Sequence, residues 1–142
     1  MSTTEKFTVD EEKARIALEK NYEEAEKILE DEDKLEKLFQ RLEKKLKSIP
    51  KVGNALSQVP IMMSMIKSYV KKEYTEVPVG TIIAMISALL FIVNPFDLIP
   101  DAIPVFGVVD DVAVTALCLK LVSTDIEEYE KWRVLNGKKL DV

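Results

Sequence analysis

The apolar residues of the N-terminal third of the chain recur at every third or fourth position, with charged residues between them. They are Ala14, Ala17, Leu18, Tyr22, Ala25, Ile28 and Leu29 over residues 10 to 30, then Leu35, Leu38, Phe39, Leu42, Leu46 and Ile49. This period matches an α-helical turn, so each stretch predicts an amphipathic helix with one buried stripe. The segment 31 to 34 between them predicts a turn, in which Asp31 or Asp33 is suited to cap the second helix.

Three further helices are predicted in the rest of the chain. The first has Pro60 in its opening turn, where the missing amide hydrogen is not needed, and continues to about Val70. The second, from Val79 to Val93, is apolar on all sides, which is typical of the centre of a bundle or of a helix in lipid. It would span about 22 Å, less than the roughly 30 Å of a bilayer core, so we expect a buried central helix. The last begins near residue 111 and stops at Gly137.

These patterns predict an all-α fold, a single-domain bundle of about five helices without strands. The helices 79 to 93 and 111 to 135 are expected to form a central apolar hairpin joined by a rigid loop rich in proline and aspartate. Residues 1 to 58 are expected to be an N-terminal helical hairpin that packs on a core domain of residues 59 to 142. Cys118 is expected to be a small buried hydrophobe, since it has no basic neighbour to lower its pKa.

Charge is distributed unevenly along the chain, whose net charge is −5. Residues 1 to 33 contain twelve acidic and five basic residues, whereas residues 34 to 72 contain ten basic and two acidic ones. The simplest interpretation is an acidic helix paired with a basic one, and the alternative is attraction of the basic stretch to an anionic membrane surface. Nucleic acid is not expected as a partner, because the net charge is negative and Phe39 alone interleaves the bases between Lys34 and Lys51.

The composition excludes several kinds of chemistry, because the chain has no histidine and a single cysteine. Ser-His-Asp and Cys-His catalysis and the usual zinc sites depend on an imidazole. An intrachain disulfide would need a second cysteine, and the start of the chain lacks the apolar segment of a secretory signal. We therefore expect no enzyme activity and no cofactor, and a cytoplasmic location, with a position peripheral to or inserted in a membrane as an alternative.

The segment "NPFDLIPDAIPVFGVVDD", residues 94 to 111, places four aspartates, three prolines and one glycine between two apolar helices. Asp110 is suited to cap the helix that follows, with Asp111 in its first turn, and Asp97 suits the start of a short turn. Asp101 has no comparable structural explanation. The prolines stiffen the segment, and Gly107 supplies a permissive backbone. The segment therefore predicts a stiff corner between two buried helices.

The longer stretch "ALLFIVNPFDLIPDAIPVFGVVDDVAVTALCLKLV" resembles the core motif of the YkvA-like family, a domain of unknown function. The likeness extends over roughly residues 66 to 122 and leaves out about the first sixty. It implies a small helical protein, often bacterial and frequently suspected of membrane association, and it implies no particular activity. The signature loop that it defines contains Pro95, Asp97, Pro100, Asp101, Pro104, Gly107, Asp110 and Asp111.

Two hypotheses about function follow. The favoured one is a non-catalytic helical interaction module that binds a protein, a membrane surface or a second copy of the chain, with Phe96, Ile99 and Phe106 of the loop available for contact. The alternative is a site for a hard cation such as Mg²⁺, Ca²⁺ or Mn²⁺, or a hydrolytic site, because these ions prefer carboxylate oxygens. Its ligands would be Asp97, Asp101, Asp110 and Asp111, whose spacing matches no standard calcium loop.

Overall fold

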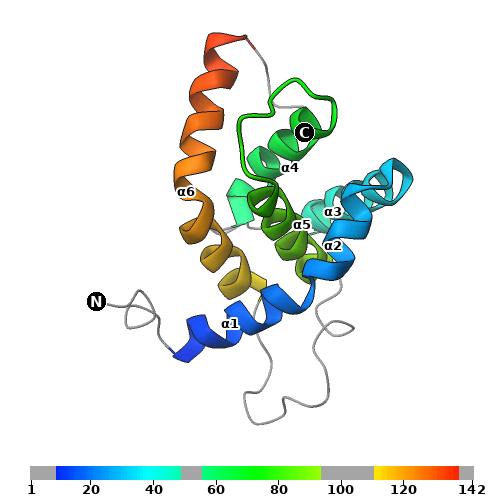
Figure 1. Cartoon of the computed structure of the whole chain (residues 1–142). Helices are drawn as coiled ribbons and strands as arrows, with labels where there is room; N and C mark the ends of the chain where they lie inside the picture. Colours follow the sequence, from blue (N-terminus) through cyan, green and yellow to red (C-terminus); the bar gives the residue numbers. More distant parts are fainter. Residues whose placement is uncertain (1–8, 49–55, 94–110, 138–142) are drawn as a thin grey trace.

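The structure is a computed structural model that describes residues 9 to 48, 56 to 93 and 111 to 137 (Figure 1). Within these ranges it contains helices and no strand, which confirms the all-α prediction. The α-helices are α1 (Val9–Lys20), α2 (Tyr22–Leu29), α3 (Glu32–Ser48), α4 (Val59–Val70), α5 (Val79–Val93) and α6 (Asp111–Leu135), and a short 3-10 helix, η2 (Leu56–Gln58), leads into α4. The described ranges thus hold six α-helices where the sequence predicts about five.

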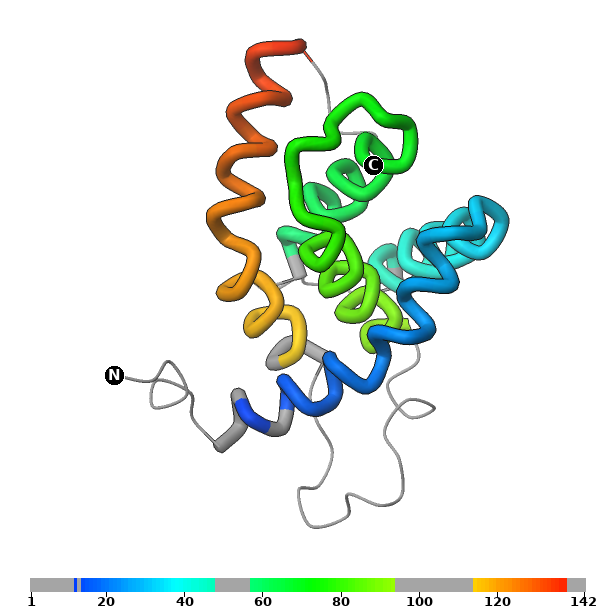
Figure 2. Tube along the Cα trace, viewed as in Figure 1, coloured from blue at the N-terminus to red at the C-terminus, as the bar shows by residue number. Residues whose placement is uncertain are grey.

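Helix α5 lies at the centre of the bundle and contacts each of the other α-helices. Figure 1 shows α6 on one side of α5 and α2 with α3 on the other, while α1 runs along the lower end of the bundle. The tube in Figure 2 follows α1 along this lower end and then into α2. The N-terminal helices therefore pack against the hairpin of α5 and α6, as the sequence predicts.

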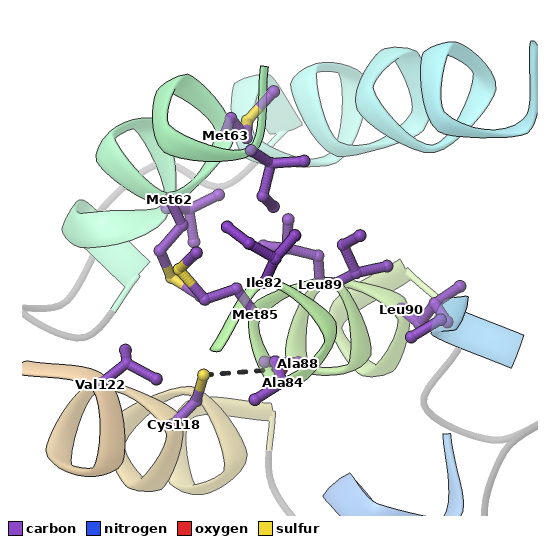
Figure 3. Packing of buried hydrophobic residues seen from close by; sticks show 14 of the residues in the cluster. Met62, Met63, Ile82, Ala84, Met85, Ala88, Leu89, Leu90, Cys118 and Val122 are labelled. Carbon is purple, nitrogen blue, oxygen red and sulfur yellow. Dashed lines mark hydrogen bonds between the residues drawn. The ribbon is translucent and has the colours of Figure 1, made fainter. Parts of the chain in front are cut away.

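Most apolar side chains of α5 are enclosed by protein. From Ile82 to Ile92 every residue except the half-buried Ile83 is buried. Figure 3 shows Met62 of α4 and Val122 of α6 directed towards this helix. Burying one such side chain contributes about 1.5–3 kcal/mol, so α5 is a main source of the stability of the fold. The expected buried central helix is confirmed.

The single helix predicted over residues 10 to 30 is instead two helices that break at Asn21. The hydroxyl of Ser87 on α5 donates a hydrogen bond to the carbonyl of Leu18, and the side-chain amide of Asn21 donates to the carbonyl of Ser87 at 3.5 Å. The backbone amide of Asn21 reaches only three residues back, to the carbonyl of Leu18 at 3.2 Å, which tightens the turn. A side chain that inserts into the hydrogen-bond ladder is a known cause of a helix kink. The prediction was wrong here because α5 supplies the interrupting group.

Three predicted helix starts are confirmed. The carboxylate of Asp31 accepts hydrogen bonds from the backbone amides of Asp33 and Lys34, at 3.0 and 3.3 Å, so this aspartate caps α3. Pro60 occupies the first turn of α4. Helix α6 begins at Asp111, as expected, while its predicted cap at position 110 lies outside the described residues.

The C-terminal half of α6 is held against α4 by a buried tyrosine. The hydroxyl of Tyr129 lies 2.6 Å from the Oγ of Ser64 and 3.0 Å from the Oγ of Ser68. Its ring also packs on Tyr74 and Trp132, with centroid separations of 5.1 and 5.6 Å. This contact combines a large apolar surface with a satisfied polar group, and Trp132 covers the edge of the core.

Candidate functional site

The signature loop predicted from the sequence lies almost entirely outside the described residues. Of its members only Asp111 falls inside them, as the first residue of α6. The contact residues Phe96, Ile99 and Phe106 also belong to the range 94 to 110. Convergence of the loop aspartates on a cation therefore stays a prediction. Among the residues that the structure describes, no group of three or more acidic or cysteine side chains is arranged to hold a metal ion.

The described residues carry a second candidate site on the solvent side of α3. Basic residues recur there at intervals of three or four, and each is exposed. Residues at this spacing share one side of a helix, so their charges form a continuous strip. We call this strip the basic face, and it consists of Lys34, Lys37, Arg41, Lys44 and Lys47.

The buried stripe of α3 orients the basic face towards solvent. Leu35, Leu38, Phe39 and Leu42 are buried, and α3 packs on α5. The ammonium of Lys45 donates a hydrogen bond to the carbonyl of Ile92, in the last turn of α5. That carbonyl has no partner within its own helix, and a cation is favourable at this negative end of the helix dipole. Lys45 thus ties α3 to α5 and serves the fold.

The two flanks of α3 differ in their charges. Next to α2 lies a hollow of about 380 Å³ whose charged lining is Lys20, Lys34, Lys37, Arg41 and Glu24. Four bases therefore face one acid on this flank. We call this site the α2/α3 hollow.

The opposite flank of α3 borders α4 across a hollow of about 300 Å³. Its lining contains two acids, Glu32 and Glu36, and two bases, Lys67 and Lys71. The ammonium of Lys67 also lies 5.4 Å from the ring centroid of Phe39, within range of a cation–π interaction. Charge is thus balanced beside α4 and predominantly positive beside α2.

Sequence reasoning identified the basic stretch but missed the part that Lys20 takes in the α2/α3 hollow. Lys20 belongs to the acidic N-terminal segment and ends α1, immediately before the break at Asn21. The position of Lys20 beside the hollow depends on that break, because the break sets the direction of α2. The group that interrupts the helix is the hydroxyl of Ser87. The adjacent asparagine, a residue with a poor helix propensity, was the available local signal.

Cys118 is a completely buried side chain of α6. Burial raises the pKa of its thiol to about 12. The sulfur lies 3.6 Å from the carbonyl oxygen of Ala84, to which the thiol donates a weak hydrogen bond (Figure 3). A thiol that stays protonated and buried is not a nucleophile, so the prediction of a small buried hydrophobe is confirmed.

The fold and this surface define an all-α bundle built around a neutral buried helix, with a strip of exposed bases on one side. Residues 81 to 117, from the first turn of α5 to the first turns of α6, match the family described as Protein of unknown function (DUF1232). The chain is also 33% identical over 79 residues to the "Uncharacterized membrane protein YkvA" of Bacillus subtilis (strain 168), an alignment that covers 56% of this chain and 74% of the relative. The chain belongs to this YkvA-like DUF1232 family, as its signature loop predicts.

No solved structure matches the chain. Among the helices that the structure describes, none combines the length and the apolar character needed to cross a bilayer.

Proposed function

We propose that this protein is a non-catalytic helical interaction module that associates with anionic membrane surfaces through the basic face of α3. The observation that carries the proposal is the exposed strip of five bases in a chain whose net charge is −5. Each Lys or Arg near an anionic leaflet contributes about 1 kcal/mol of attraction, so a strip of this size is sufficient for reversible binding. The relative from Bacillus subtilis is called a membrane protein, which supports an association with membranes.

The basic face suits a membrane better than it suits nucleic acid. Binding of single-stranded nucleic acid commonly uses aromatic side chains on which the bases stack. The aromatic residue of α3, Phe39, is buried on the opposite side of the helix, with Lys67 over its ring. A flat anionic surface needs no such platform, because attraction between charges is sufficient.

A vesicle flotation experiment tests the proposal. The full chain is mixed with vesicles of phosphatidylcholine, with or without about 30 mol% phosphatidylglycerol, at low ionic strength. We expect flotation with the anionic vesicles alone, and release as the ionic strength rises to about 0.3 M, because salt screens exposed charges. Protein that stays in the soluble fraction with anionic vesicles at low salt contradicts the proposal.

A matched pair of variants separates the basic face from net charge. Lys44→Gln/Lys47→Gln removes two exposed bases from the basic face, whereas Lys27→Gln/Lys131→Gln removes two exposed bases from α2 and α6. Both variants have the same net charge. We expect the first to weaken vesicle binding by about tenfold or more and the second to change it by less than about threefold. Equal losses would mean that the basic face has no special part in binding.

A further inference from the structure

We propose that the α2/α3 hollow is a binding site for a phosphomonoester group, and that it gives the basic face a preference among anionic membranes. The inference rests on the proposed function, because Lys34, Lys37 and Arg41 belong both to the basic face and to the hollow. It adds a specific ligand chemistry to a surface otherwise described by its charge alone. The ligand group is a phosphate joined to carbon through a single ester oxygen.

The basic side chains converge on the hollow from two helices. Lys34, Lys37 and Arg41 lie on the flank of α3 that faces α2, at the helical spacing of three and four residues. Lys20 enters from the end of α1, beside the break at Asn21. A ligand in the hollow therefore meets cations on opposite sides, an arrangement that a single row of surface lysines does not provide.

The charge of the lining fits a dianion better than a monoanion. Among the lining residues four bases outnumber the single acid, Glu24. A phosphomonoester carries about 1.5 to 2 negative charges near neutral pH, with three oxygens that accept strong hydrogen bonds. A phosphodiester, as in phosphatidylglycerol, carries a single charge and offers fewer such oxygens. Arginine and lysine donors bind phosphate through charge-assisted hydrogen bonds, so the monoester gains more from this lining.

The lining also contains an apolar part that suits the body of a lipid. Ile28, Leu38 and Leu90 contribute to the wall of the hollow, and each is buried. They come from three different helices, α2, α3 and α5, so this part of the hollow rests on the core of the bundle. The volume of about 380 Å³ is large enough for a phosphate with its glycerol unit. Phosphatidic acid combines a phosphomonoester group with an apolar lipid body, whereas a soluble glycerol phosphate has the phosphomonoester group alone.

Pairing between the acidic α2 and the basic α3 would be the structural explanation of the same charges. That pairing predicts a balanced lining, as on the opposite flank, where Glu32 and Glu36 match Lys67 and Lys71. On the α2 flank Glu24 is the single acid among the lining residues. The excess of base therefore distinguishes this hollow from an ordinary seam between helices of opposite charge.

The test compares vesicles that contain phosphatidic acid with vesicles that contain phosphatidylglycerol, both in phosphatidylcholine and adjusted to equal surface potential. We expect the full chain to bind the first about fivefold or more tightly, the size of effect that one net hydrogen bond supplies. Equal affinity for the two vesicles overturns the inference and leaves the proposed function intact.

Two double variants of α3 with the same charge assign the preference to the hollow. Lys34→Gln/Lys37→Gln removes two lining bases, and Lys44→Gln/Lys47→Gln removes two bases of the same helix outside the lining. Both should weaken general binding to a similar degree. We expect the first to abolish the preference for phosphatidic acid and the second to keep it. A preference that survives in the first variant, or disappears in both, overturns the inference.

Competition with sn-glycerol 3-phosphate distinguishes the two sources of the ligand group. Release of the protein from phosphatidic acid vesicles means that a soluble phosphomonoester occupies the hollow, and continued binding means that the membrane-borne group is needed. If the chain binds no vesicle, the proposed function fails and the hollow is tested directly with sn-glycerol 3-phosphate. A rise in Tm that Lys34→Gln/Lys37→Gln loses then upholds the hollow, and an unchanged Tm overturns it.

Discussion

Helices α3 and α5 are of similar length, 17 and 15 residues, but they differ in charge and in burial. Helix α5 contains no charged residue and is surrounded by the other helices. Helix α3 buries one apolar stripe against α5 and exposes bases on the other side. The apolar character of α5 from Ile82 to Ile92 thus reflects burial in protein, whereas the surface proposed to bind membranes is the charged one.

The difference has a physical cause in the cost of removing groups from water. Burial of apolar surface stabilises the folded state by about 25 cal/mol per Å². The fold is therefore most stable when an uncharged helix lies where it has least contact with solvent. Charged side chains lose favourable hydration on burial, so they stay outside unless they find partners. Lys45 shows the exception, since it is half-buried and donates to the carbonyl of Ile92. Stability should therefore respond to changes in α5, and binding to changes in α3.

The largest expected effect is that of truncating a buried side chain of α5. Phe91 is completely buried, and Phe91→Ala should lower the free energy of unfolding by about 3–5 kcal/mol through lost transfer energy and the cavity left behind. Urea denaturation followed by circular dichroism measures it. Lys44→Ala, on the exposed side of α3, is the control and should change stability by less than about 0.5 kcal/mol. Similar losses in the two variants would remove the distinction between the helices.

A smaller loss is expected from removing a buried hydroxyl. Tyr129→Phe leaves the hydroxyls of Ser64 and Ser68 without their shared partner and should cost about 1–3 kcal/mol. The triple variant Tyr129→Phe/Ser64→Ala/Ser68→Ala removes the whole polar group and should recover part of that loss. Thermal unfolding of the three proteins checks the order. If the triple variant recovers none of the lost stability, the hydroxyls stabilise the fold through packing and not through their hydrogen bonds.

The buried thiol predicts a loss of stability at alkaline pH. The pKa of Cys118 is about 12 in the folded protein, raised by burial from 9.0. Because the folded state disfavours the thiolate, this contribution is complete below about pH 9 and falls as the pH rises towards 12, by on the order of 1 kcal/mol at about pH 10. Unfolding curves between about pH 8 and pH 10 measure the slope.

The variant Cys118→Ala is the control for this pH dependence. It should flatten the alkaline slope, although burial also raises the pKa of Tyr22 and Tyr74, which leaves a residual slope. A disulfide reagent at about pH 8 should modify the wild-type thiol only as fast as the protein opens. Fast modification of the native protein would contradict the enclosed position of Cys118.

The smallest effect on stability is expected from the basic face. Lys34→Gln/Lys37→Gln and Lys44→Gln/Lys47→Gln should each change the free energy of unfolding by less than about 0.5 kcal/mol, because all four lysines are exposed. The helix dipole makes the first change slightly stabilising and the second slightly destabilising. Thermal melts without vesicles check both. A loss above about 1.5 kcal/mol in either variant would mean that these lysines hold the fold together.

The local features of the fold were predictable because they depend on neighbours in the sequence. A period of three to four residues placed the helices, the carboxylate of Asp31 capped α3, and Pro60 opened α4. The candidate site was predictable only in part. The sequence showed the basic stretch, with pairing to an acidic helix as its simplest interpretation and a membrane surface as the alternative, but the charge balance of its two flanks depends on which helices lie beside α3.

The sequence alone determined an all-helical bundle of the YkvA-like family, with a neutral helix at its centre, because apolar periodicity and local capping suffice to specify such elements. The tertiary structure decided where α1 and α2 separate, since the hydroxyl of Ser87 donates a hydrogen bond to the carbonyl of Leu18, 69 residues away in the sequence. It also decided that Lys45 reaches the end of α5, 47 residues along the chain. The α2/α3 hollow depends on that same packing, since its walls come from helices whose neighbours no local pattern specifies.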